Sequence, residues 1–437
     1  METTAATAPD YAPAPLPNER RNFVLGVANG GIYQGGETFV DSNTVLPVLL
    51  STLTHSNALI GLGCAMGDIG WLLPQVFVAP WASRLPRQLP LYQRASIVRG
   101  SCLFAVALAA WAMRGHPGWL LAAFFTLNGI YSVAGGFGAV AFMEIVGRTV
   151  RSERLGAFFA QRLFWGGTLG AVAGLFARQV LRMEDPGTQL AILFGLAAII
   201  CSSAYMMFGS IREPESPAHP TAPNPLALLR QGVRWFHGES VFRRLFWARV
   251  TLSIWLASSP FITLFAVNQL GGGGRAAGTL LVGRLAGYVL STLLWQRLSK
   301  RSGNRTILRI AASLGCGLLL VSAGLSWASP WGMGWIPARL ALLGLEAVAT
   351  LGGAVSSGLI VGYAAAMIEN APLGQRQSFV SLMNTFVGPT MLLPMLGGFV
   401  VDAFNAPLLF LLCGIASIAG LRAVSRLPDR AARALAT

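Results

Sequence analysis

Long runs of apolar residues restrict the fold of this 437-residue chain more than any other feature of its sequence. A helix that crosses the hydrocarbon core of a membrane needs about 20 mostly apolar residues. Twelve such runs occur, and they are too long and too evenly apolar for the alternating strands of a membrane barrel. The predicted spans are 23–50, 58–80, 95–113, 118–146, 155–180, 188–209, 245–268, 275–296, 306–327, 335–367, 377–402 and 405–424.

The composition agrees with a membrane protein and excludes other classes. Hydrophobic residues make up 54% of the chain and charged residues 11%, whereas an average soluble domain is about 25% charged. So few polar side chains could not cover a soluble protein of this size. We therefore expect an all-α polytopic membrane protein. The five cysteines stand singly in apolar runs, so we expect no metal site, and nothing in the sequence calls for a cofactor.

The basic residues predict which ends of the spans face the cytoplasm. With the N-terminus inside, 23 of the 32 Lys and Arg fall in inner segments, five in outer loops and four within spans. Such an excess predicts that both termini lie in the cytoplasm and that the chain is a multi-pass protein of the cell membrane. The net charge of +15 then reflects attraction to anionic lipid, and we expect no nucleic-acid partner.

The chain divides into two sets of six predicted spans. We expect a flexible cytoplasmic tail at 1–22, a six-helix bundle at 23–209, a linker at 210–244, a second six-helix bundle at 245–424 and a cytoplasmic tail at 425–437. Within the linker, Asn224 and Pro225 are typical of a helix start, and the apolar face that follows predicts a helix lying in the membrane interface.

The two halves also repeat a pattern. Arg154 lies 12 residues before Gly166, and Arg376 lies 12 residues before Gly388, which aligns span 5 with span 11. Internal repeats of this kind are typical of secondary transporters.

The order of spans and loops resembles the major facilitator superfamily over nearly the whole chain. That family carries Gly-x-x-x-Asp-Arg-x-Gly-Arg in the loop after span 2 and again after span 8. Both loops here keep basic residues and lack the aspartate, which in the family helps to latch the two halves together. The candidate gating residues implied by this resemblance are Ser83, Arg84, Arg87, Lys300, Arg301 and Arg305.

Two further motifs resemble exporter branches of the same family. Asp41, Thr44 and Pro47 resemble a first-span signature, and Gly166 and Gly170 belong to a GxxxGxxxG run similar to a fifth-span motif. The resemblance implies two halves that rock about a central cavity lined by spans 1, 4, 7 and 10. It favours export slightly over import.

Polar residues in span 1 lie on one stripe and are candidates for the transport site. Gln34, Glu37 and Asp41 recur at helical spacing together with Gly30 and Thr44, so they share one face. Since charges in hydrocarbon are costly, this face should meet water or protein. Glu37 and Asp41 could carry protons or pair with a buried Arg or a cationic substrate; a purely structural ion pair is the alternative.

Other charged residues fall inside the predicted spans. Arg162 and Arg284 keep their charge, and we expect their partners to be Glu37 and Asp68 or an anionic substrate. Glu346 is expected to face the cavity, and the repeat places Asn384 at the position matching Arg162. The remaining buried arginines lie near the predicted span starts, where the side chains can reach the interface, so we interpret them as snorkelling. These are Arg99 and Arg249.

The sequence therefore predicts a secondary transporter of a small organic solute, with protons as the expected coupling ion, a bilayer around it and a monomeric state. Two alternatives stay open: a transport-inactive relative that acts as a sensor or partner, and an importer or symporter of an anionic solute. We expect no enzyme activity, because the sequence lacks clustered catalytic residues, and its only lysine, Lys300, stands in no Walker motif.

Overall fold

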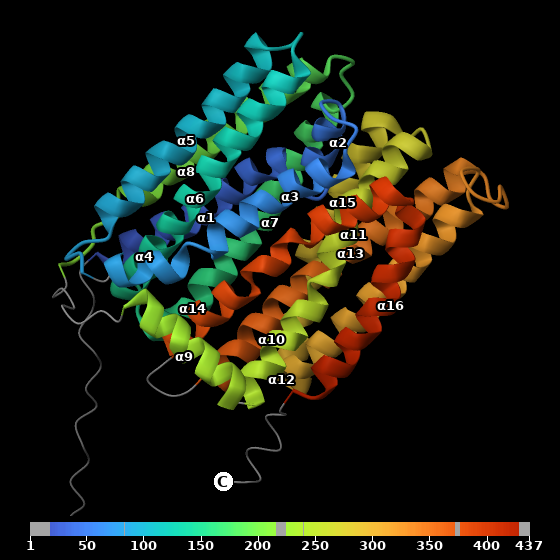
Figure 1. Ribbon diagram of the computed structural model, residues 1–437. Helices are drawn as coiled ribbons and strands as arrows, with labels where there is room; N and C mark the ends of the chain where they lie inside the picture. Colours follow the sequence, from blue (N-terminus) through green and yellow to red (C-terminus); the bar gives the residue numbers. More distant parts are fainter. Residues whose placement is uncertain (1–17, 83, 216–223, 239, 372–375, 428–437) are drawn as a thin grey trace, which may run out of the picture.

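The computed structural model describes residues 18–82, 84–215, 224–238, 240–371 and 376–427, which form helices joined by short loops (Figure 1). The elements are α1 Glu19–Glu37, η1 Thr38–Val40, α2 Val45–Ser51, α3 Asn57–Leu72, α4 Gln75–Ala82, α5 Leu89–Ala112, α6 Pro117–Thr149, α7 Ser152–Val180, α8 Pro186–Gly209, α9 Pro225–Gly238, α10 Ser240–Leu252, α11 Ile254–Leu264, η2 Phe265–Gln269, α12 Gly273–Ala328, α13 Ala338–Asn370, α14 Arg376–Val387, η3 Gly388–Leu392, α15 Leu393–Ala403 and α16 Ala406–Ser425.

Ten helical stretches in the described chain are long and apolar enough to cross a membrane, so the protein is an integral multi-pass membrane protein. They correspond to ten of the predicted spans. The other two, 23–50 and 155–180, form α1–η1–α2 and α7. The first is broken after Glu37, and the second carries Arg154, Arg162 and Arg178. The count of twelve spans stays a prediction.

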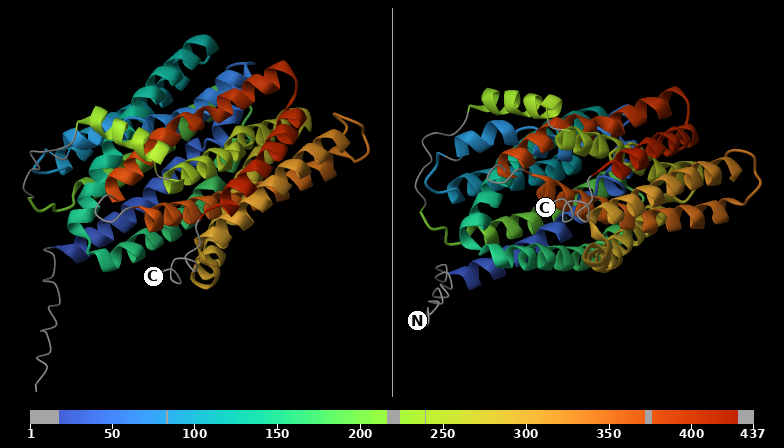
Figure 2. Two further views of the ribbon diagram at one scale, coloured as in Figure 1. Left: turned by 60° about the horizontal axis from the view of Figure 1, so that its bottom comes forward. Right: turned by 90° about the horizontal axis from the view of Figure 1, so that it is seen from below.

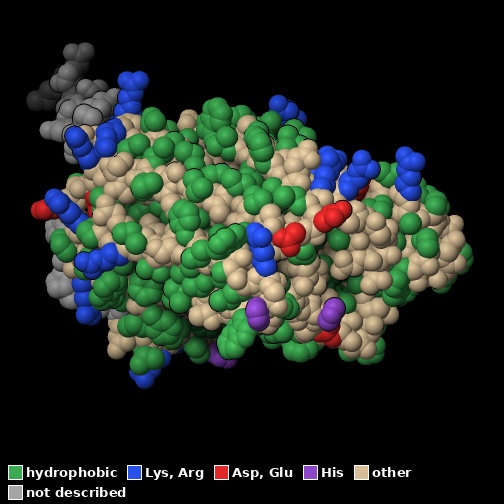
Figure 3. All heavy atoms as spheres, turned by 90° about the horizontal axis from the view of Figure 1, so that it is seen from above, with side chains coloured by type: hydrophobic (Ala, Val, Ile, Leu, Met, Phe, Trp, Pro, Cys, Tyr) green, Lys and Arg blue, Asp and Glu red, His purple; other side chains and the backbone are tan. Residues whose placement is uncertain are grey.

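Large apolar side chains on the outside of the molecule agree with a hydrocarbon environment. Ile97, Met206 and Leu290 are 68%, 70% and 69% exposed, which would be unfavourable in water. Figure 3 shows one such face, where hydrophobic side chains and backbone cover most of the surface and Lys and Arg lie mainly towards its margins.

Spans 2 and 11 break at a proline, whereas Pro260 lies inside α11. α3 gives way to α4 at Pro74, and η3 with its Pro389 separates α14 from α15. Proline lacks the N–H that the helix ladder needs, and its ring clashes with the preceding turn. Spans 5 and 11, aligned by the repeat, therefore differ in shape, because α7 has no such break.

The helices form two groups, which lie side by side in all three ribbon views (Figures 1 and 2). In the first group α1 packs on α7 and α8, α3 on α6, and α5 on α6 and α8. In the second, α12 packs on α13 and α16, α10 on α16, and α11 on α15. Two seams join the groups, α3 with α15 and α7 with α12.

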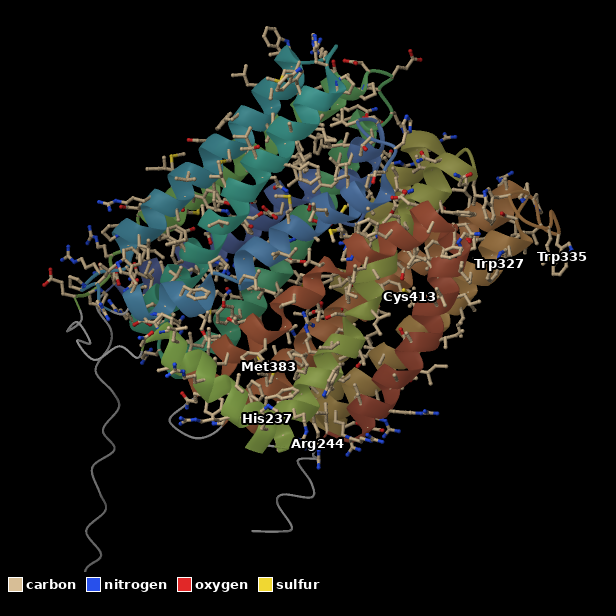
Figure 4. All side chains as sticks on the ribbon, in the orientation of Figure 1. His237, Arg244, Trp327, Trp335, Met383 and Cys413 are labelled. Atoms are coloured by element: carbon tan, nitrogen blue, oxygen red, sulfur yellow. The ribbon has the colours of Figure 1, made fainter. Side chains whose placement is uncertain are left out.

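The two ends of the molecule carry different features. We name the tail face the end where α1 begins and α16 ends, and the far face the opposite end. Figure 4 shows His237 and Arg244 towards the tail face and Trp327 and Trp335 towards the far face. Helix α9 lies across the tail face, packed on α4, α10 and α14 (Figure 1). It begins where the sequence predicted, and Asn224 Oδ1 accepts a 3.0 Å hydrogen bond from the Leu226 N–H.

Candidate functional site

Glu37 lies at the end of α1 in a cluster with tyrosines and an arginine. Its Oε1 accepts a short hydrogen bond from the Tyr131 hydroxyl of α6 and lies 3.9 Å from Arg99 Nη2 of α5. The Glu37 side chain is 29% exposed, so one side of the carboxylate meets the cluster and the other stays accessible. The stripe predicted on span 1 thus brings its central acid to a charged partner.

Arg99 is the centre of this cluster, and the prediction that it snorkels is wrong. Arg99 Nη2 donates hydrogen bonds of 2.9 Å to the Tyr33 hydroxyl and 2.6 Å to the Tyr131 hydroxyl. Its guanidinium carbon lies 4.3 Å from the ring centroid of Tyr131 and 5.1 Å from that of Tyr205. Aromatic faces stabilise a cation removed from water, so the cluster holds Arg99 inside the helix group.

The helix start explains the error for Arg99. The sequence placed the start of span 3 at 95, but α5 begins at Leu89. Glu213 sets this start: its Oε2 accepts 2.8 Å hydrogen bonds from the Gln88 and Leu89 N–H groups. Arg99 is therefore almost three turns into the helix and beyond the reach of the interface.

Asp41 joins the two helix groups through an ion pair with Arg284. Its Oδ2 pairs with Arg284 Nη2 of α12, and both side chains are 15% exposed. The predicted pairing of Arg284 with Glu37 and Asp68 is therefore wrong, and its alternative, an anionic substrate, stays a prediction. The open alternative that Asp41 pairs with a buried Arg is confirmed. A neighbouring contact also links the groups: the Thr263 hydroxyl donates to the Asn43 carbonyl at 2.9 Å.

Arg162 has no carboxylate partner among the described residues, so the predicted pairing with Glu37 and Asp68 is wrong here as well, and the alternative of an anionic substrate stays a prediction. Its Nη1 donates to the Gly26 carbonyl and, at 2.9 Å, to Asn29 Oδ1, both on α1. Its guanidinium carbon lies 4.6 Å from the Phe142 ring. Carbonyl dipoles and an aromatic face replace the acid and fasten α7 to α1.

Asp68 is exposed although it lies in the middle of the span formed by α3 and α4. The guanidinium carbon of Arg249 on α10 lies 5.1 Å from the ring centroid of Tyr363 on α13, a contact within the second helix group. That Arg249 snorkels stays a prediction.

The candidates that remain are Gln34, Glu346 and Asn384, and they lie on three different helices. Gln34 is exposed on α1 and packs against Gly166 of α7. Glu346 lies about two turns from the far-face end of α13. Asn384 is half-buried on α14.

Two of the candidate gating residues contact neighbours within their own helix group. Arg87 Nη2 lies 2.9 Å from Glu215 Oε1 after α8, and Arg305 Nη2 donates to the Ser425 carbonyl at the end of α16. Arg84 and Arg301 are exposed. Ser83 and the Lys300 side chain lie outside what the structure describes.

Asp402, which the sequence analysis did not single out, caps a helix of the other group at the far face. At the end of α15, its carboxylate accepts hydrogen bonds from the Asn57 and Ala58 N–H groups at 2.9 and 3.0 Å. These N–H groups open α3, and a negative charge is stabilised at a helix N-terminus. The sequence marks Asp402 only weakly, as a single acidic residue after an apolar run.

Other missed residues are the tyrosines around Arg99. Tyr33 and Glu37 are four residues apart on α1 and so share a face, a signal that the sequence does contain. Tyr131 and Tyr205 come from α6 and α8, and no local pattern links them to Glu37.

The comparisons with known proteins were made on sequence and on structure. No family model matches the sequence, and no curated protein matches it either. The structure, by contrast, is similar to solved transporters. The D-xylose-proton symporter has a TM-score of 0.70 at 14% identity, covering 94% of this chain and 98% of that chain. The nucleoside transporter NupG has a TM-score of 0.69 at 13% identity, covering 94% and 100%.

A third similar structure is a bacterial homologue of the iron transporter ferroportin in its outward-facing state. Its TM-score is 0.66 at 12% identity, and the match covers 93% of this chain and 99% of that chain. These structures are of transporters and not of enzymes. At such low identities they establish the fold, which is that of major facilitator transporters.

Proposed function

We propose that this protein is a secondary transporter that moves a small organic solute across the cell membrane by alternating access. Residues 23–209 and 245–424 act as two six-helix bundles joined by the linker 210–244. The basic residues near the tail face support a cytoplasmic location for that face and for both termini. The observation that carries the proposal is the ion pair between the bundles, in which Asp41 pairs with Arg284 of α12, together with the cluster of Glu37, Arg99 and Tyr131 in the first bundle.

The polar contacts between the bundles support a conformation that is closed at the far face. The Asp41–Arg284 pair, the Thr263–Asn43 hydrogen bond and the Asp402 cap all join the bundles on that side. At the tail face, ion pairs join residues of the first bundle and its linker, such as Arg148 with Glu213 at 3.0 Å.

Glu37 is the proposed proton carrier. As a carboxylate it accepts a hydrogen bond from Tyr131 and faces Arg99. Protonation would remove its attraction to Arg99. Since Glu37 lies four residues before Asp41, which pairs with Arg284 of the other bundle, a change in this cluster could reach the contact between the bundles.

The test is solute flux into and out of proteoliposomes, with and without an imposed pH gradient. We expect flux of a small organic solute to respond to the gradient in the wild type. Glu37→Gln should retain solute binding and lose this response, because the amide cannot carry the proton. Glu184→Gln, which changes an exposed acid in the loop between α7 and α8, should behave as wild type.

Two results would contradict parts of the proposal. A flux that ignores the gradient, with full activity of Glu37→Gln, would exclude proton coupling. An absence of flux across a broad solute library, with no ligand-dependent thermal shift, would favour a sensor that no longer transports. The same assay measures direction, for which export is proposed on the sequence resemblance alone.

A further inference from the structure

A basic pocket opens at the tail face, away from the charges of the proposed transport site. It measures about 560 Å³ and lies between the end of α16 and the first turns of α10. The two helices pack against each other, and Figure 4 shows Arg244 at this end of the molecule. The residues that line the pocket are Arg243, Arg244, Trp247, Ala423 and Arg426.

The three arginines of this pocket bring positive charges together, and no acid among the described residues lines it. Arg244 Nη1 donates to the Arg426 carbonyl at 3.3 Å, which fixes α10 to the end of α16. All three arginines are exposed, and within the described part of the chain none forms an ion pair with a carboxylate. Like charges that line one pocket repel one another, so an anion bound among them would relieve the repulsion.

The surface beside the pocket is apolar on the side that leads towards the middle of the spans. Trp247, 50% exposed, lies one turn further along α10 than Arg243. On α16, Ile415 and Ile418 are 53% and 41% exposed. Tryptophan is enriched where membrane meets water. A ligand that fits both parts carries an anionic head and an apolar chain.

We propose that this pocket binds the phosphate of an anionic phospholipid, with an acyl chain along Trp247. Guanidinium groups form paired, charge-assisted hydrogen bonds to phosphate oxygens. The apolar surface favours a lipid over free phosphate, because a free ion would use only the arginines. The bound lipid would bridge α10 and α16 at the face that we assign to the cytoplasm, where anionic lipids concentrate.

The experiment measures lipid binding to the full chain, purified in a neutral detergent, by native mass spectrometry. The probes are dioctanoyl phosphatidylglycerol, dioctanoyl phosphatidylcholine and inorganic phosphate. We expect phosphatidylglycerol to bind the wild type at least tenfold more tightly than phosphatidylcholine. The triple variant Arg243→Gln/Arg244→Gln/Arg426→Gln should lose that preference, and Trp247→Ala should weaken phosphatidylglycerol several-fold while phosphate binding stays unchanged.

A matched control separates the pocket from surface charge in general. Arg230→Gln/Arg234→Gln/Arg309→Gln removes three exposed arginines elsewhere on the chain and should keep the wild-type preference. The variant Arg243→Lys/Arg244→Lys/Arg426→Lys retains the charge and loses the paired geometry, so it should bind with intermediate affinity and shows the effect even if the glutamine variant fails to fold.

Three results would overturn the proposal. One is an equal loss in the control variant, which would indicate only general electrostatics. Another is wild-type binding by both pocket variants. The third is phosphate binding as tight as that of phosphatidylglycerol, which would indicate a free-anion site.

Discussion

The two carboxylate oxygens of Asp41 have different partners, and this decides what the residue does. Oδ1 accepts hydrogen bonds from the Asn43 and Thr44 N–H groups at 3.0 and 2.9 Å and from the Thr44 hydroxyl at 2.6 Å. These bonds shape the turn between η1 and α2. Oδ2 pairs with Arg284 of the other helix group. One side chain therefore both breaks the first span and ties the groups together.

This pair predicts the effect of removing Arg284. Arg284→Ala leaves the buried Asp41 charge without a counter-charge and should cost about 3–5 kcal/mol of stability. Arg284→Ala/Asp41→Asn should cost less than the single change, because the amide keeps an acceptor for Thr44 without the charge. Chemical unfolding in mixed micelles measures both. Arg182→Ala, an exposed arginine, serves as the control; additive effects of the two changes would exclude the pair.

Residue positions were predictable where helical spacing alone decides them. The spacing placed Gln34, Glu37 and Asp41 on one stripe, but it could not assign Asp41 to Arg284, since 243 residues separate them. Arg99 was misread for a similar reason. The start of α5 depends on Glu213, a contact across 124 residues to Leu89, and nothing near Arg99 in the sequence signals it.

At the scale of elements, Gly303 lies at the turn between two consecutive membrane-spanning stretches of α12. α12 contains two apolar stretches, Gly273–Ser299 and Arg301–Ala328. Gly303, with φ of 78°, is the point where its backbone leaves the helix. Residues with a Cβ are strained at such angles, whereas glycine adopts them readily. Near it, Asn304 Nδ2 donates to Glu369 Oε1 of α13 at 2.8 Å and holds the turn against α13.

Gly303→Ala should destabilise the protein through backbone strain alone, by about 1–3 kcal/mol. A Cβ at this position would meet no atom within 4 Å, so steric contact is not the cause. Gly317→Ala is the matched control, because Gly317 also lies on α12 with nothing within 4 Å and an ordinary φ. The control should be neutral or stabilising by about 0.5–1 kcal/mol. Equal changes in the free energy of unfolding would refute the strain argument.

The elements themselves followed from the sequence, because twenty apolar residues bounded by polar loops leave few other structures. A proline marks the breaks at Pro74 and Pro389 in the sequence. No proline marks the break after Glu37, and the hydrogen bonds of Asp41 that shape it lie within the turn itself.

At the scale of the whole molecule, glycines allow the two seams to close tightly. A Cβ on Gly398 would collide with the Asn57 carbonyl, and one on Gly61 with the Pro394 carbonyl, so α3 and α15 touch through their backbones. In the other seam Gly174 faces Leu285 of α12, whereas Gly166 and Gly170 of the same GxxxGxxxG run face Gln34 and Thr38 of the first group. The run therefore packs α7 against helices of both groups.

Alternating access requires the far-face seam to open during each cycle, which a reversible cross-link can test. Asn57 Nδ2 lies 2.8 Å from Asp402 Oδ1 across the seam between α3 and α15. Oxidising Asn57→Cys/Asp402→Cys should form a disulfide that abolishes solute flux, and a reductant should restore it. The five native cysteines are buried and should not interfere.

The control is Ser291→Cys/Ser357→Cys, because those hydroxyls lie 2.7 Å apart within the second group. Since this bridge joins helices that move together, solute flux through the control variant should persist after oxidation. Full flux through the cross-linked Asn57–Asp402 variant would mean that the two groups do not rock apart at this face.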